Sequence, residues 1–168
     1  MPGENKKNEV RTAVTERGPA PFPLESLLAV GQDVILPPAD ITFAPVLVEF
    51  GGVTTYIRRS FTGLEVIAAS KLLSYTPPPH PIASLPEDEQ QALSQADRTK
   101  LSEKFVKDVE EKFNQHMVAQ LESITESGDA NALWEQMKDL PEIISDRLFR
   151  GMYRIAGLVN EQGKFLAL

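Results

Sequence analysis

A proline-rich segment near the middle of the chain limits how the fold can be organised. Four prolines stand within YTPPPHP, residues 75–81. Proline fixes φ and lacks an amide donor, so this segment is excluded from the interior of a helix or a sheet. A stiff, extended, polyproline-like conformation is expected instead. The segment should separate an N-terminal part that contains strands from a C-terminal part that is helical.

The chain is 168 residues long, which suggests one domain with appendages. Its first residues are polar and mixed in charge, and nothing there can bury an apolar face, so a disordered arm is expected. The predicted parts are a disordered arm (1–20), a β-hairpin plus helix subdomain (21–76), a proline-rich linker (77–83) and a helical subdomain (84–168).

Two strand-like runs joined by two glycines predict a β-hairpin in the first subdomain. Residues 41–50 (ITFAPVLVEF) are rich in β-branched and aromatic side chains, and residues 53–59 (VTTYIRR) alternate in polarity. Gly51 and Gly52 suit the positive φ angles of a two-residue turn. Pro45 would cost a central strand one hydrogen bond, so we expect the first strand to be an edge strand or to carry a bulge.

The hairpin should lead directly into a helix. Thr62 and Glu65 have the spacing of a capping box, in which each side chain binds the other residue's backbone amide. The helix is expected to run to about Ser74. Its apolar stripe is predicted to consist of Leu64, Ile67, Ala68 and Leu72.

The second half begins with another helix-start pattern. Ser84 and Glu87 have the spacing of a second capping box. A long helix is expected from about 97 to 127, because apolar side chains recur along it every four residues. That spacing departs from a heptad repeat, which favours a helix packed within one domain over a coiled coil.

Two further helices and a short tail complete the chain. Asp129 can cap a short helix, and a last helix is expected from about 140 to 157. Residues 163–168 end in FLAL and should form a short strand or a peptide that docks in a groove. The predicted fold class is α+β, with a small N-terminal β-hairpin or sheet followed by a mainly α-helical C-terminal half.

Charge and composition exclude several functions. The net charge of −7 disfavours general nucleic-acid binding and docking on anionic lipid, because both need surplus cationic side chains. There are no cysteines, which excludes disulfides, zinc ribbons and thiol catalysis. No apolar run has the roughly 20 residues of a membrane span, and the N-terminus lacks the apolar centre of a signal peptide. We therefore expect a cytoplasmic protein, in the host cytoplasm if it is viral.

The sequence marks no catalytic, cofactor or metal site. His80 and His116 lack a partner at metal-ligand spacing, so a structural role is favoured for both. The acidic residues at 87–89 suit a helix start, where carboxylates complement the helix dipole. No phosphate loop, G-x-S-x-G elbow or S-x-x-K pair is present. An enzyme is therefore disfavoured.

Arginines and aromatic residues are the remaining candidates for binding. Arg58 and Arg59 end a strand just before a helix. Arg147, Arg150 and Arg154 share one helix face. This arginine face could bind nucleic acid. Because the molecule is acidic, ion pairs within the chain or a protein interface are favoured instead. Aromatic side chains on the C-terminal helices, Trp134 and Tyr153, belong either to the core or to a partner site.

One stretch resembles a known family. VEFGGVTTYIRRSFTGLEVIAASKLL, residues 48–73, resembles the opening of phage tail assembly chaperones. Its two glycines look like that family's hairpin turn, residues 56–59 like the end of its tyrosine- and arginine-bearing strand, and Thr62 with Glu65 like its helix start. The long N-terminal arm and the PPPHP segment depart from the family's simple pattern. The resemblance implies a non-enzymatic protein that binds a tape measure protein and tail tube subunits during assembly.

The leading hypothesis is a protein-binding assembly factor, a phage tail assembly chaperone or adaptor that self-associates and binds an apolar helical client. Apolar stripes on the C-terminal helices beyond what one chain needs would cover that client. The alternatives are a structural subunit of a virion or secretion-type particle, and a nucleic-acid-binding regulatory protein. The predicted protein-binding residues are Tyr56, Arg58, Arg59, Phe61, Trp134, Arg147, Arg150 and Arg154.

Overall fold

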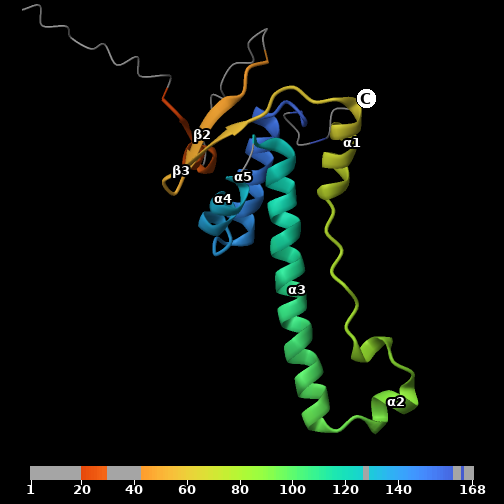
Figure 1. Ribbon diagram of the computed structural model, residues 1–168. Helices are drawn as coiled ribbons and strands as arrows, with labels where there is room; N and C mark the ends of the chain where they lie inside the picture. Colours follow the sequence, from red (N-terminus) through yellow and green to blue (C-terminus); the bar gives the residue numbers. More distant parts are fainter. Residues whose placement is uncertain (1–19, 30–42, 127–128, 161–163, 165–168) are drawn as a thin grey trace, which may run out of the picture.

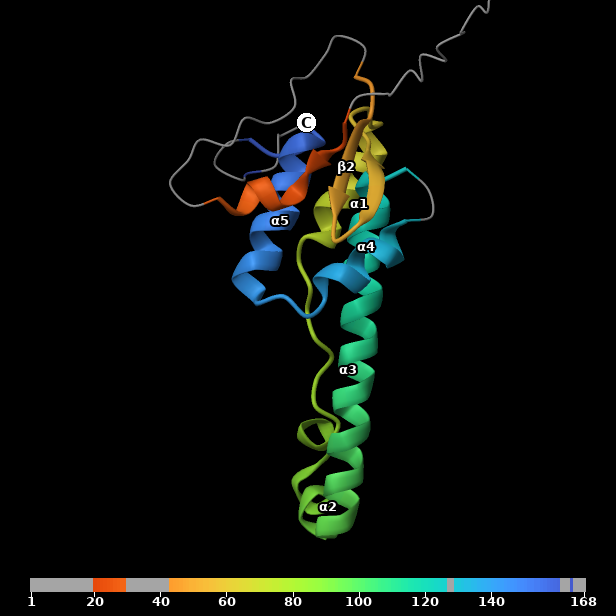
Figure 2. The ribbon, with the colours of Figure 1, turned by 90° about the vertical axis from the view of Figure 1, so that its left-hand side faces the viewer.

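The computed structural model describes residues 20–29, 43–126, 129–160 and 164. A small sheet and a mainly helical second half form a head, from which one long helix projects (Figures 1 and 2). The predicted α+β class is thereby confirmed. Most of the predicted arm and most of the tail at 163–168 lie outside the described residues.

The elements follow one another in the order expected for a sheet followed by helices. They are β1 (Phe22–Pro23), the 3₁₀ helix η1 (Leu24–Leu28), β2 (Val46–Phe50), β3 (Val53–Ile57), α1 (Gly63–Leu72), the 3₁₀ helix η2 (Ile82–Ser84), α2 (Glu87–Ala92), α3 (Gln95–Ile124), α4 (Ala130–Met137) and α5 (Glu142–Ile155).

The predicted hairpin is formed by β2 and β3, but its first strand is not an edge strand. The two strands are antiparallel, and Gly51 and Gly52 adopt φ angles of 56° and 79° in the turn between them. The strand order is β1-β2-β3, so β2 is central among the described strands. The edge-strand expectation was wrong because β2 begins only after Pro45, and the proline therefore costs the ladder no hydrogen bond.

The capping box at the start of α1 is confirmed. The Glu65 carboxylate accepts a 2.7 Å hydrogen bond from the Thr62 amide, and the Thr62 hydroxyl accepts one of 3.3 Å from the Glu65 amide. Arg58, at the end of the hairpin, adds a 2.7 Å ion pair to Glu65 and lies 4.8 Å from the centre of the Phe61 ring. The strand-to-helix turn is thus held by hydrogen bonds, charge and a cation–π contact.

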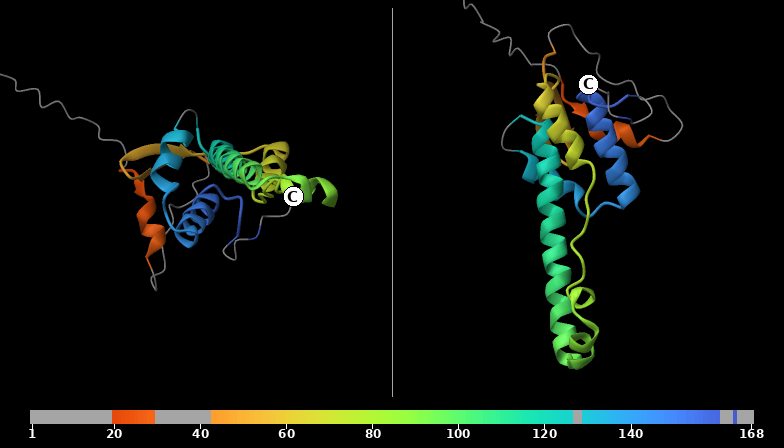
Figure 3. Two further views of the ribbon diagram at one scale, coloured as in Figure 1. Left: turned by 90° about the horizontal axis from the view of Figure 1, so that it is seen from below. Right: turned by 90° about the vertical axis from the view of Figure 1, so that its right-hand side faces the viewer.

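The face that α1 buries differs from the predicted stripe. Leu64 and Ile67 have exposed fractions of 80% and 42%, whereas Ala69 is fully buried. Helix α1 is apolar on nearly every side, so spacing alone did not identify the face that meets α3. The helix lies against the C-terminal part of α3, on the opposite side from α4 (Figures 1 and 3).

Helix α3 begins and ends at identifiable interactions. The Ser94 hydroxyl accepts a 3.1 Å hydrogen bond from the Asp97 amide and so caps the N-terminus. At the other end, the Arg58 amide donates to the carbonyl oxygen of Ile124 at 2.8 Å, and the Glu126 amide donates to that of Tyr56 at 2.9 Å. The helix ends before the predicted 127 because this part of the chain pairs with β3.

Most of α3 extends beyond the head, and the chain from the proline segment to α2 runs back beside it (Figures 1 and 2). We call this hairpin-like projection, residues 77–112, the stalk (Figure 2). The His80 and Phe105 rings lie 4.6 Å apart, and the Arg98 guanidinium donates to the carbonyl oxygens of Gln90 and Leu93. These contacts hold the proline-rich segment and α2 against the long helix.

The second predicted capping box is wrong. Helix α2 begins after Pro86, with no side-chain hydrogen bond at its cap. Ser84 lies in η2, and its hydroxyl donates instead to the carbonyl oxygen of His80 at 3.2 Å. The Thr62 and Ser84 sequences have the same spacing, but only the first stands one residue before a helix.

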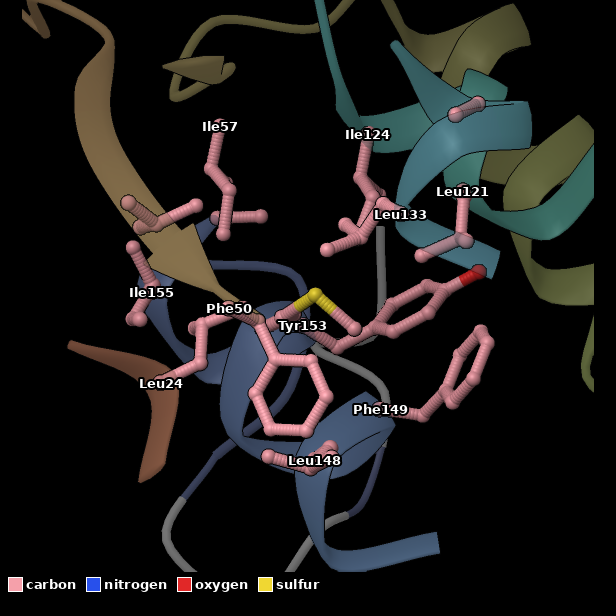
Figure 4. Packing of buried hydrophobic residues seen from close by; sticks show 14 of the residues in the cluster. Leu24, Phe50, Ile57, Leu121, Ile124, Leu133, Leu148, Phe149, Tyr153 and Ile155 are labelled. Atoms are coloured by element: carbon pink, nitrogen blue, oxygen red, sulfur yellow. The ribbon is translucent and has the colours of Figure 1, made fainter. Parts of the chain in front are cut away.

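One hydrophobic core lies where the sheet, η1 and helices α3, α4 and α5 meet (Figure 4). Leu24, Ile57, Ile124, Leu133 and Met152 are all fully buried there. Burial of each such side chain contributes roughly 1.5–3 kcal/mol. Residues from both sides of the predicted linker therefore share one core.

Candidate protein-binding groove

A groove of about 730 Å³ lies between α3 and α5. The chain after α1 forms one border, and α4 with the turn before α5 forms another. Its volume is within the range typical of binding pockets in proteins. The lining residues that matter for binding are Leu73, Tyr75, Phe113, Met117, Trp134 and Phe149.

Aromatic rings from four parts of the chain meet in the groove. The ring centres of Tyr75 and Phe113 are 5.4 Å apart, those of Phe113 and Trp134 6.0 Å, and those of Trp134 and Phe149 6.2 Å. All three pairs are edge-to-face, the arrangement that the ring quadrupole favours. The groove therefore has a rigid apolar floor.

Trp134 is held firmly in this floor. Its indole Nε1 donates a 2.9 Å hydrogen bond to the side-chain oxygen of Asn114 on α3. Trp134 and Phe149 are buried, because α4 and α5 pack them against α3. This bond satisfies the one polar group of a buried ring and fixes its orientation.

The mouth of the groove exposes apolar surface. Leu73, just after α1, has an exposed fraction of 45%, and Phe113 one of 38%. Met117 and Leu140 are half-buried beside them. Large apolar side chains that line a concave surface and remain in contact with water are typical of a protein-binding site.

Charged side chains surround the mouth in opposite-sign pairs. Lys138 lies 2.6 Å from Glu135, and Arg150 lies 2.9 Å from Asp146. The hydrogen bond to Glu135 raises the pKa of Lys138 above its usual value. Both pairs are exposed, so each adds little stability. The rim therefore has no strong net charge.

Tyr153, His116 and His80 have surroundings that suit structural roles. Burial raises the pKa of the Tyr153 hydroxyl, and a hydrogen bond with Ser123 partly offsets that effect. His116 packs on the Tyr75 ring at 5.1 Å and His80 on Phe105, so the two histidines do not converge. Within the described part of the chain, no group of three acidic or histidine side chains is placed to hold a metal ion.

The predicted binding residues do not form one site. Arg58 and Phe61 stabilise the start of α1, and Arg59 donates a 3.0 Å hydrogen bond from Nε to the carbonyl oxygen of Ile155. Tyr56 is exposed on the outer face of β3. These residues belong to the junction between the hairpin and the helices, away from the groove.

The C-terminal candidates are divided between the groove and the outer face of α5. Trp134 and Arg150 line the groove. Arg147 is exposed and Arg154 half-buried on α5. Because Arg150 is paired with Asp146, the arginine face is partly neutralised, as expected for ion pairs on an acidic protein.

Sequence reasoning missed most of the groove. Tyr75 was assigned only to the proline-rich segment, and Phe113 only to the stripe of the long helix. Phe149 is absent from the predicted binding residues, although it stands three residues before Met152 and so has helical spacing to an apolar residue of α5. One available signal was the aromatic residue two positions before three consecutive prolines, which marks an extended segment able to pack on a helix.

Comparisons with known proteins give the chain no relative. It matches no family model, no curated protein and no solved structure. The described helices include none that combines the length and the apolar character needed to cross a membrane. The groove itself is therefore the basis for a functional proposal.

Proposed function

We propose that this protein is a non-enzymatic assembly factor that binds an apolar helical segment of a client protein in the groove between α3 and α5. One observation carries the proposal: Leu73 and Phe113 expose apolar surface at the mouth of a cavity of about 730 Å³ with an aromatic floor. A helix presents apolar side chains at positions i, i+3, i+4 and i+7, and such anchors fill an apolar groove. The acidic, largely polar remainder of the surface keeps the complex in solution.

The surplus apolar surface is not where the helical stripes predict it. In α4 and α5 the apolar stripes pack into the core of the same chain, because Leu133, Leu148 and Met152 are fully buried. Exposed apolar side chains lie on α1, at the groove, at Ile143 in the first turn of α5, and on the stalk, where Val106 has an exposed fraction of 62%. The proposal therefore depends on the groove and not on the outer faces of α4 and α5.

The more specific form of the proposal is a phage tail assembly chaperone whose client is a tape-measure-like or tube-like protein. Its support is the resemblance of residues 48–73, which form the hairpin turn, the Arg58–Glu65 pair and the capped start of α1. These features position α1 and hence Leu73 beside the groove. The predicted self-association belongs to this form of the proposal, and sedimentation velocity at several concentrations measures it.

The test is capture of a defined client by two matched variants. A tape measure protein is co-expressed with the full chain carrying either Phe113→Asp, in the groove, or Val106→Asp, on the exposed stalk. Both substitutions place a carboxylate on α3 at an exposed apolar position. We expect Phe113→Asp to lose the client and Val106→Asp to retain it. Equal capture by both variants would place binding elsewhere, and no capture by the unsubstituted chain would refute the tape-measure client.

A further inference from the structure

We infer that helix α1 of this chain pairs with α1 of a second copy, in an antiparallel arrangement about a two-fold axis. The contact surface is an apolar stripe on the outer face of the helix. Leu64 and Ile67, three residues apart, have exposed fractions of 80% and 42%, and Ala68, the next residue, is also exposed. The pairing involves neither the groove nor a client, so it is independent of the proposed function.

The stripe faces away from the rest of the head. Ala69, on the other side of α1, is fully buried, and the helix packs chiefly on α3. Because α1 lies at the outside of the head, no other described helix covers its outer face (Figures 1 and 3). Leu64 is the most exposed large apolar side chain among the described residues. Removal of this stripe from water therefore favours association with another surface.

The charges of α1 favour a second copy of the chain as the occupant. Glu65 stands near the start of the helix and Lys71 near its end. When two copies of α1 are antiparallel and centred on the middle of the stripe, Lys71 of one copy lies opposite Leu64 of the other. Its long side chain then reaches Glu65 of the second copy, whose side chain is 41% exposed beside its ion pair with Arg58. The two-fold axis repeats this contact, so the stripe is complementary to itself.

The same charges disfavour other arrangements of two copies. A parallel pair would place the two Lys71 side chains next to each other, where like charges repel. The net charge of −7 makes two copies repel each other over most of their surface. The exposed centre of the α1 stripe carries no carboxylate, because Leu64, Ile67 and Ala68 are all apolar. Two acidic molecules can therefore approach each other at this face.

The stripe is short, so the dimer should be weak. Stable interfaces bury about 800 Å² per partner, and three side chains of a ten-residue helix offer less. We expect a monomer at about 10 μM and a dimer fraction that grows towards about 1 mM. Sedimentation equilibrium of the full chain over this range measures the dimer Kd. A monomer at every concentration would overturn the inference.

Matched substitutions locate the contact. Leu64→Asp places a carboxylate in the stripe, whereas Ile143→Asp on α5 and Val106→Asp on the stalk place one at apolar positions with exposed fractions of 63% and 62%. All three variants change the net charge equally. We expect Leu64→Asp to raise the dimer Kd by about tenfold or more and the two controls to leave it within about twofold. A dimer that persists in Leu64→Asp, or that all three variants weaken alike, would overturn the inference.

Disulfide formation tests the antiparallel arrangement, since the native chain has no cysteine. Ala68 would lie near the two-fold axis, whereas the two copies of Leu64 would be about 10 Å apart along the helix axes, too far for a disulfide. Under mild oxidation we expect a disulfide-linked dimer from Ala68→Cys and none from Leu64→Cys. A linked dimer from Leu64→Cys, or none from Ala68→Cys, would overturn the antiparallel pairing. Neither measurement involves a client, so failure here is distinct from failure of the proposed function.

Discussion

The Nε atom of Arg59 donates a 3.0 Å hydrogen bond to the carbonyl oxygen of Ile155, joining the end of the hairpin to the end of the last helix. The two residues are 96 positions apart in the chain. The last carbonyls of a helix lack intrahelical donors and carry partial negative charge. Arg59 therefore supplies both a donor and a compensating charge where the N-terminal and C-terminal parts of the head meet.

Removal of this side chain should destabilise the fold. We expect Arg59→Ala to lower the free energy of unfolding by about 1.5–3 kcal/mol, the range for hydrogen bonds that involve a charged group. Arg147→Ala, at an exposed position on α5, is the control and should change it by less than about 0.5 kcal/mol. Urea denaturation of both variants measures the difference. If the two variants are equally stable, the hydrogen bond from Arg59 to Ile155 does not stabilise the fold.

The capping box makes part of the stability depend on pH. The hydrogen bond from the Thr62 amide, and then that from Arg58, lower the pKa of Glu65 from 4.5 to about 2. Because the pKa is lower in the folded state, ionised Glu65 stabilises the fold above about pH 4.5, and this contribution is lost as the pH falls towards 2. Glu65→Gln should be less stable than the native chain at pH 6, and the difference should vanish near pH 2. Urea denaturation across this range would show a constant difference if Glu65 had no such role.

Close packing of α5 against η1 predicts an intolerance at Gly151. A Cβ atom there would lie 2.4 Å from Cδ1 of Leu27. Gly151→Ala should therefore cost about 1–3 kcal/mol, as overpacking does, although alanine favours a helix. Gly63→Ala, with open space around the added atom, is the control and should be neutral or slightly stabilising.

The cause can be checked with a double variant. In a Leu27→Ala background the clash at Gly151 is relieved, so Gly151→Ala should cost much less there. If Gly151→Ala still lowers stability as much in the Leu27→Ala background, the clash with Leu27 is not the cause of the loss. Thermal unfolding of the four chains of this cycle provides the measurement.

The hydrogen bond in the groove floor predicts a further effect. Asn114→Ala would leave the buried indole of Trp134 without an acceptor and should destabilise the fold by about 1–3 kcal/mol. Asn114→Asp keeps an acceptor oxygen and should lose less. Trp134 is the single tryptophan, so its emission reports the change directly. Unchanged stability and emission in Asn114→Ala would contradict the assigned role of this bond.

Sequence patterns correctly predicted the parts of the fold that depend on interactions between residues close together in the chain. The Gly51-Gly52 turn and the Thr62–Glu65 capping box depend on residues within three or four positions of one another, and both are present. The Ser84–Glu87 pattern has the same spacing but failed. The chain there is drawn towards α3, and Ser84 bonds to His80 instead.

Long-range contacts account for what the sequence did not predict. Helix α3 ends early because Ile124 and its neighbours pair with β3, far away in the chain. The exposed face of α1 could not be predicted because apolar residues are spread around nearly every side of the helix. The groove brings Tyr75, Phe113 and Phe149 together from three separate parts of the chain, so no single stretch contains its pattern.

The central claim is that the groove between α3 and α5 is where another polypeptide binds. Photo-crosslinking measures this most directly, with benzoylphenylalanine placed at Phe113 or, as the control, at Val106 in cells that co-express the tape measure protein. Both positions lie on α3 and reach solvent. The account predicts that the client is crosslinked from position 113 and not from position 106. Crosslinking of the client from position 106 alone, or from neither position while the two proteins still co-purify, would contradict it.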